Sequence, residues 1–294
     1  MFYRRKIILA LLQLFDGQLE KIRLQKLLFL LAERQEKSDY NFIPYRFGCY
    51  SFSVNADLST MVTKGFLGAD EKHFDKIDNA DYIKQLKPDD QKLLLELKNN
   101  YGKLSTNALI KHTYLNYPFY AIKSEVAKDI LSTSEMQKVN DAMPKCDTTI
   151  LFTIGYEGIS LEEYLVRLLK NGVKVLVDVR NNPLSMKFGF SKSQLIKYCE
   201  SIGIQYLHFP ELGIQSELRQ ELNSQSDYDK LFSAYRKITL SKTSNTQIAI
   251  LNLLKQNKRI ALTCFEANIC QCHRKHLAEA IASLPDFLYE VKHI

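Results

Sequence analysis

The sequence predicts two domains: a mostly helical, winged-helix-like domain at residues 1–146, and an α/β domain with a doubly wound parallel sheet at residues 147–294. Three observations lead to this prediction. The length of 294 residues favours two domains of about 150 residues each. Apolar residues recur at helical spacing in the first half, whereas the second half alternates short apolar strands with amphipathic helices. The change between the two patterns falls at residues 144–148 and marks the boundary.

In the first half, two amphipathic helices open the domain and are separated by a turn at Asp16 and Gly17. A turn-rich aromatic stretch covers residues 40–51, and a helix near residues 54–64 precedes a strand-like segment at residues 65–67. This order of elements is typical of a winged-helix-like bundle. A further helix at residues 135–142 ends the domain.

The second half contains five apolar runs of strand length with helical stripes between them. A strand at residues 149–154 is followed by a helix that opens with a capping box of Ser160 and Glu163. Two strands joined by a helix form a βαβ unit, which requires a parallel sheet. The remaining predicted strands cover residues 173–179, 204–208, 259–264 and 288–293, and the remaining predicted helices cover residues 191–203, 227–240, 246–256 and 273–283.

The composition narrows the classes of protein to consider. Hydrophobic residues make up 46% and charged residues 25%, as in ordinary globular proteins. Apolar runs are too short to span a bilayer, and the six cysteines do not form a secreted disulfide framework. We therefore expect a cytoplasmic protein with no membrane partner. A net charge of +7 is compatible with a nucleic acid or a phosphate-bearing small molecule as partner, but it selects neither.

Titratable side chains gather where the predicted strands end. Ligands of open parallel sheets bind beyond the carboxyl ends of the strands, because loops and helix N-termini meet there. We therefore expect one pocket at this edge of the sheet. The candidates are Tyr156, Glu157, Asp178, Arg180, His208, Cys264, Glu266, Cys272, His273 and Arg274.

Three mechanisms are open for these residues. In the first, Arg180 and Arg274 clamp a phosphate at the N-terminus of the last helix, with Tyr156 and His208 also binding substrate. Glu266 or Asp178 then acts as general base or nucleophile in hydrolysis or group transfer.

In the second mechanism, Cys264 or Cys272 is a thiolate nucleophile, because a helix N-terminus and the nearby His273 or Arg274 lower a thiol pKa. In the third, the cluster binds zinc. The zinc ligands would come from Cys264, Cys270, Cys272, His273 and His276. The spacing of these residues does not follow the paired pattern of familiar zinc sites, so we predict no cofactor and keep zinc as an alternative.

Three of the candidates also have a structural interpretation. Asp178 can simply brace Arg180 through an ion pair, Cys264 can serve as a small buried apolar residue, and His208 can be a half-buried histidine with satisfied hydrogen bonds.

The motifs of the second half resemble the domain of unknown function 488 family, from about residue 150 to residue 294. This resemblance implies a Rossmann-like α/β domain that serves in nucleotide-linked or nucleic-acid-linked processes, with no settled reaction. Cys270 is a departure from the pattern. The motifs are at residues 153–158, 177–183, 188–191, 206–213, 264–266 and 272–274.

Residues 5–130 resemble the Panacea domain, which occurs in prokaryotic antitoxins and related interaction proteins. The resemblance rests on the segments at residues 27–31, 40–51 and 117–124, and it implies a domain that binds a protein or a polynucleotide. The preferred hypothesis is thus an enzyme of nucleotide or nucleic-acid metabolism, a hydrolase or transferase, with a recruiting N-terminal domain. The alternative is a non-catalytic regulator or antitoxin-like adaptor.

Overall fold

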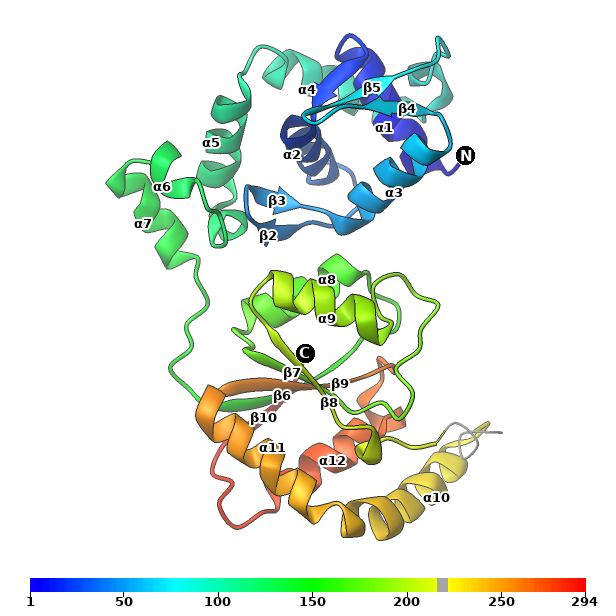
Figure 1. The fold of residues 1–294 in the computed structure, drawn as a ribbon, viewed down its shortest axis with the longest axis vertical. Coiled ribbons are helices and arrows are strands. Elements are labelled where there is room, and N and C mark those ends of the chain that lie inside the picture. Colours follow the sequence, from blue (N-terminus) through cyan, green and yellow to red (C-terminus); the bar gives the residue numbers. More distant parts are fainter. Residues whose placement is uncertain (216–221) are drawn as a thin grey trace. The chain divides into compact units, whose positions relative to one another are not determined.

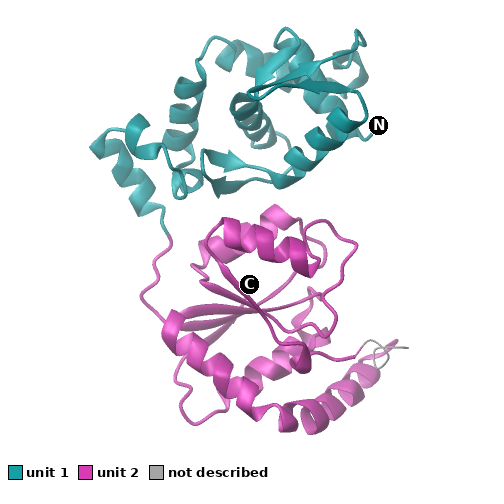
Figure 2. Cartoon of the chain, in the orientation of Figure 1, with its two compact units in different colours: residues 1–143 teal, residues 144–294 magenta. Residues whose placement is uncertain are grey.

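The computed structural model describes residues 1–215 and 222–294 (Figure 1). The chain forms two compact units, residues 1–143 and residues 144–294 (Figure 2). Each unit has its own hydrophobic core. We describe them one at a time.

Unit 1 is mostly helical, as the sequence predicts. Its core is made by α1 (Tyr3–Leu14) and α2 (Lys21–Ala32), whose apolar residues are almost completely buried. The other helices are α3 (Phe52–Thr63), α4 (Pro88–Tyr101), α5 (Thr106–Asn116), α6 (Ala127–Ile130) and α7 (Thr133–Asp141). In the described part of the chain, no helix of either unit has the length and apolar character needed to span a membrane.

Two small antiparallel sheets complete unit 1. One has the order β1-β5-β4, formed by Gln18–Glu20, His73–Lys76 and Leu67–Ala69. The other is a hairpin of β2 (Ile43–Tyr45) and β3 (Gly48–Tyr50), which the sequence shows only as an aromatic, turn-rich stretch. Gly48 has a φ of 88°, and a Cβ there would meet the ring of Tyr114, so the hairpin requires glycine at this position.

Unit 2 contains a five-stranded, all-parallel sheet, which confirms the predicted fold class. The strand order is β10-β6-β9-β7-β8. Every residue of β6 and β9 is buried, as expected for central strands of a sheet covered on both faces. The strands are β6 (Ile150–Gly155), β7 (Val175–Asp178), β8 (Gln205–His208), β9 (Arg259–Cys264) and β10 (Glu290–His293).

Helices cover both faces of this sheet (Figure 1). On one face lie α8 (Leu161–Lys170) and α9 (Lys192–Ser201), and Ser160 caps α8 by accepting a hydrogen bond from the backbone of Glu163. On the other face, α11 (Ser244–Asn257) packs against β9, and α12 (His273–Ala282) packs against β6 and β9. Before α11, α10 (Gln225–Tyr235) continues into η5 (Arg236–Leu240), a π-helical segment.

Candidate functional site

A buried ion pair occupies the end of β7. Asp178 is fully buried and Arg180 is 5% exposed. The Arg180 Nε lies 2.9 Å from Asp178 Oδ1 and 3.0 Å from Oδ2, and the backbone N–H of Arg180 donates to Oδ1 at 3.0 Å. The hydroxyl of Tyr206, on β8, donates to Oδ2 at 2.6 Å. Both carboxylate oxygens of Asp178 are therefore engaged inside the protein.

The other side of the Arg180 guanidinium is also engaged. Its Nη1 donates to the Tyr156 hydroxyl at 2.8 Å and to the backbone carbonyl of Phe190 at 2.9 Å. The ring of Tyr156 stacks on Phe190 with centroids 4.2 Å apart. Burial lowers the pKa of Arg180, but hydrogen bonds and charge from Asp178 outweigh this and raise it overall. Arg180 and Asp178 thus form a structural brace, the interpretation that the sequence left open beside a catalytic one.

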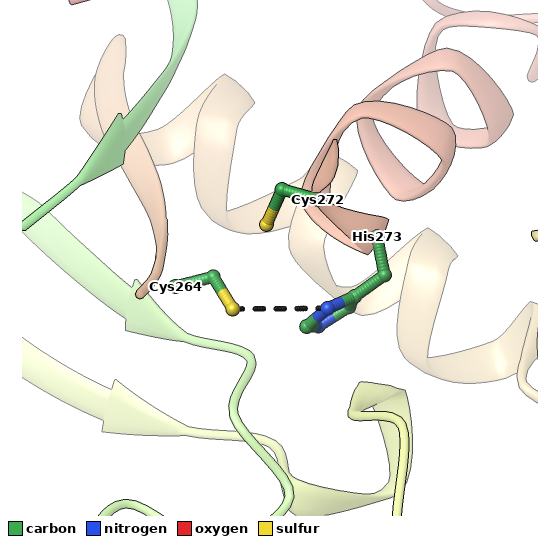
Figure 3. Close-up of side chains that lie close together, drawn as sticks. All are labelled: Cys264, Cys272 and His273. Carbon is green, nitrogen blue, oxygen red and sulfur yellow. Dashed lines mark hydrogen bonds between the residues drawn. The ribbon is translucent and has the colours of Figure 1, made fainter. Parts of the chain in front are cut away.

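A second cluster joins the ends of β9 and α12. Cys264 is the last residue of β9, Cys272 caps α12, and His273 is the first residue of that helix. All three are at most 1% exposed, and one ligand-type atom from each lies within 4.8 Å of the others. Figure 3 shows the two sulfur atoms and the imidazole gathered at one point, with Cys264 Sγ 3.7 Å from His273 Nδ1. The Cys264 Sγ also lies 3.1 Å from Glu266 Oε2.

The orientation of His273 is fixed by the backbone. Its Nε2 lies 3.0 Å from the carbonyl oxygen of Val179, which can only accept a hydrogen bond. Nε2 therefore carries the proton, and in the neutral ring Nδ1 is the acceptor that faces Cys264. Burial raises the pKa of Cys272 well above its ordinary value, and the hydrogen bond and charge of Cys264 add to this. This direction opposes the thiolate that the sequence suggested at Cys272.

Cys264 also belongs to the wall of a pocket of about 280 Å³. Tyr156 and Arg180 are the other sequence-predicted site residues on this wall. The loop after β7 supplies further polar residues. Asn181 and Asn182 belong to the motif at residues 177–183 but were not among the predicted site residues, and Ser185 lies outside that motif. The complete wall consists of Tyr156, Arg180, Asn181, Asn182, Leu184, Ser185, Ile214, Cys264 and Phe265.

The remaining predicted binding residues lie near this pocket without being among its wall residues. His208 contacts the backbone carbonyl of Arg180 through Nε2 at 2.8 Å and lies 3.0 Å from Lys192 Nζ through Nδ1. The Arg274 guanidinium donates through Nη1 to the carbonyl of Glu266 at 2.5 Å, and its Nε is buried without a hydrogen-bond partner among the described residues. Both guanidinium groups of the expected phosphate clamp, those of Arg180 and Arg274, make hydrogen bonds to the protein itself, and the clamp stays a prediction.

Two of the five candidate zinc ligands lie outside the buried cluster. Cys270 is exposed in the 3-10 turn η6 (Ile269–Gln271). His276 is not part of the cluster, and its Nδ1 lies 2.9 Å from Arg236 Nη1 and 3.3 Å from Glu279 Oε2. The group that could hold a metal ion therefore reduces to three residues, Cys264, Cys272 and His273.

Comparison with known proteins identifies the second unit. No curated protein matches the chain. The family model described as Domain of unknown function DUF488 matches residues 160–281, a range that includes Arg180 and the whole Cys264, Cys272 and His273 cluster. The resemblance of residues 5–130 to the Panacea domain stays a prediction. The resemblance of the C-terminal half to this family is thus confirmed over residues 160–281.

Proposed function

We propose that unit 2 is a hydrolase or transferase in which Cys264 is the nucleophile and His273 the general base. One observation carries this proposal: the Cys264 side chain belongs to a pocket wall and also lies 3.7 Å from a correctly oriented imidazole nitrogen. A nucleophile, a base within reach and a third group that orients the base are the elements of a covalent catalytic site. Val179 provides the third group through its carbonyl oxygen.

The proton path follows from the tautomer. His273 Nδ1 accepts the proton of the Cys264 thiol, and the resulting thiolate lies near the N-terminus of α12, whose dipole stabilises negative charge. The thiolate attacks an electrophilic centre in the pocket, the bond to the leaving group breaks, and the imidazolium returns its proton to that group. Water or an acceptor substrate then displaces the enzyme sulfur, again with His273 taking the incoming proton.

For the substrate we propose a nucleotide or another phosphate-bearing molecule. Asn181, Asn182 and Ser185 line the same pocket, and we assign the polar contacts with the substrate to their amides and hydroxyl. Phe265 is 43% exposed at the same wall and offers a ring face on which a base can stack. For unit 1 we propose recruitment of a protein or a polynucleotide, in line with its resemblance to the Panacea domain.

The test compares Cys264→Ser with Cys270→Ser. Cys270 is exposed and outside the cluster, so its variant controls for loss of a thiol alone. The full-length protein is incubated with nucleoside mono- and diphosphates, and release of phosphate or base is followed by chromatography. We expect Cys264→Ser to lose turnover by at least about a hundredfold and Cys270→Ser to retain it. Equal turnover in the two variants would rule out the nucleophile, and absence of any turnover together with intact biological activity would favour the adaptor.

A zinc centre is the second candidate, favoured by the geometry of the same cluster. Zinc–sulfur and zinc–nitrogen bonds of about 2.3 and 2.1 Å in a tetrahedron place the two ligand atoms about 3.6 Å apart, close to the 3.7 Å between Cys264 Sγ and His273 Nδ1. Zinc-bound histidine usually donates its other N–H to a carbonyl or carboxylate, as His273 does to Val179. Two cysteines and a histidine would leave a fourth position for water or substrate, where zinc acts as a Lewis acid.

Elemental analysis separates the two candidates. A zinc centre predicts one zinc per chain in the purified protein, lost in Cys272→Ser and kept in Cys270→Ser. The nucleophile predicts an active protein without stoichiometric zinc, in which an alkylating substrate analogue modifies Cys264. Zinc at one equivalent together with protection of Cys264 from alkylation would replace the nucleophile proposal with the metal centre.

A further inference from the structure

Unit 1 contains a pocket of about 210 Å³ that the proposed catalytic function does not use. It lies among α2, the β2–β3 hairpin, α3 and β5. Its wall is largely apolar, with Tyr45, Leu58 and Phe74 among the lining residues. At this size the pocket is smaller than the roughly 300–1,000 Å³ of sites for drug-sized ligands. Any occupant must therefore be small.

A buried lysine belongs to the pocket wall. Lys26, in the middle of α2, is 2% exposed, and its Nζ donates to the backbone carbonyl of Cys49 at 2.9 Å. Among the residues that the structure describes, it forms no ion pair with a carboxylate. Lysine is almost never fully buried unless its charge is paired. The position therefore lacks the anion that a buried ammonium group normally has.

The other charged side chains on the pocket wall are also basic. Lys21 and Arg46 also line the pocket, and none of the described lining residues is Asp or Glu. The amide of Gln25 is engaged with the backbone of Ser51 through both its nitrogen and its oxygen. Three basic side chains thus line one apolar cavity. Arg46 pairs with Glu125, which is not a lining residue, whereas Lys26 has no carboxylate partner among the described residues.

We propose that this pocket binds a small carboxylic acid with an apolar body, whose carboxylate pairs with Lys26. The apolar wall accounts for the body of the ligand, and the buried amine of Lys26, which has no carboxylate partner among the described residues, accounts for its acid group. A carboxylate would supply the counter-ion that Lys26 lacks in this fold. Because the amine is excluded from water, pairing with a carboxylate would distinguish an acid from its neutral amide. This site is independent of the Cys264 cluster and of the reaction proposed there.

Binding should be coupled to proton uptake. Burial lowers the pKa of Lys26, and the opposing influence of the Cys49 thiol does not cancel this effect. The thiol itself has its pKa raised by burial. The remaining charged groups at the pocket, Lys21 and Arg46, are both cations and also favour the neutral amine of Lys26. An entering carboxylate reverses this balance, so the amine takes up a proton as the acid binds.

The test is calorimetric titration of the full-length protein with hexanoate and benzoate, each compared with its amide. The wild type should bind the acids at least tenfold more tightly than the amides, with an enthalpy that changes with the ionisation heat of the buffer. Lys26→Met, which keeps the length of the side chain and removes the amine, should abolish this preference. Lys21→Met removes an amine from the same wall but leaves Lys26, and it should retain the preference.

Three results would overturn the proposal: equal affinity for acid and amide, unchanged acid binding in Lys26→Met, or no binding of either acid at millimolar concentration. If Lys26→Met does not fold, NMR spectra of the wild-type protein provide the test of carboxylate binding. The backbone amide signals of residues 21–26 and 48–50 should shift with benzoate and not with benzamide. Shifts of equal size with both compounds, or with neither, would refute carboxylate recognition.

Discussion

Replacing Asp178 with asparagine removes one charge from a pair that is almost completely excluded from solvent. The carboxylate is fully buried, and the guanidinium side chain of Arg180 is 6% exposed. Asparagine keeps the shape and one acceptor oxygen, but Arg180 stays charged because its pKa is far above neutral pH. Loss of one partner from a buried pair costs about 3–5 kcal/mol. We expect a loss near 3 kcal/mol, because the retained oxygen still accepts one hydrogen bond.

The measurement is urea unfolding of the whole chain, with hydrogen exchange of β7 and β8 to assign the effect to unit 2. The exposed pair of Glu163 and Arg167 is the matched control, since both side chains are 41% exposed and four residues apart on α8. Glu163→Gln should cost no more than about 0.5 kcal/mol. A double variant, Asp178→Asn with Arg180→Met, should recover part of the lost stability because no unpaired charge remains.

A loss below about 1 kcal/mol in Asp178→Asn would refute this reasoning, because about 1 kcal/mol is the upper range of an exposed pair. The outcome also bears on catalysis. A stable, folded Asp178→Asn protein without turnover would return Asp178 to the role of general base that the sequence allowed.

The remaining predictions concern packing, pH and thiol access. Gly155→Ala should destabilise unit 2 by about 1–3 kcal/mol or more in urea unfolding, because the new Cβ would lie 2.0 Å from the carbonyl oxygen of Glu266; wild-type stability would contradict this packing. Burial lowers the pKa of His293, so the unfolded chain binds more protons than the folded chain, and the free energy of unfolding falls as pH decreases through 6.5. His293→Gln should flatten this pH dependence, and an unchanged slope would show that His293 is not its source. Ellman's reagent should titrate exposed Cys270 rapidly and buried Cys199 only after unfolding, and rapid modification of Cys199 in the folded protein would disprove this order.

Local patterns in the sequence were sufficient for the fold of unit 2. A strand that is buried on both faces is a short run of apolar residues, and each helix between the strands has apolar residues at helical spacing. Both patterns can be recognised directly in the sequence. The hairpin of unit 1 was harder to predict. Its strands have three residues each, and the turn depends on the close approach of Gly48 to Tyr114, more than sixty positions later. Such a contact leaves no periodic signal.

The candidate site was predictable in its location and less so in its roles. The rule that ligands bind beyond strand ends selected Tyr156, Arg180 and Cys264. It could not show that Tyr206 would complete the hydrogen bonds of Asp178, because that contact depends on the register of β7 and β8. It also could not show that Cys272 is buried and Cys270 exposed. Residues that lie two positions apart on a turn can each point either into the protein or into solvent.

The order of strands in the sheet has a consequence for how unit 2 folds. β6 and β7 follow each other in the chain, yet β9 lies between them, and it begins more than eighty residues after β7 ends. During synthesis, β6 and β7 emerge before β9, the strand with which both of them pair. If β6 and β7 paired with each other first, β9 could not take its place between them. Non-local pairing of this kind slows folding and leaves strand edges exposed to aggregation. Ribosome-bound chains that stop before residue 259 should therefore be sensitive to protease in β6 and β7, and chains in which β9 has emerged should become resistant.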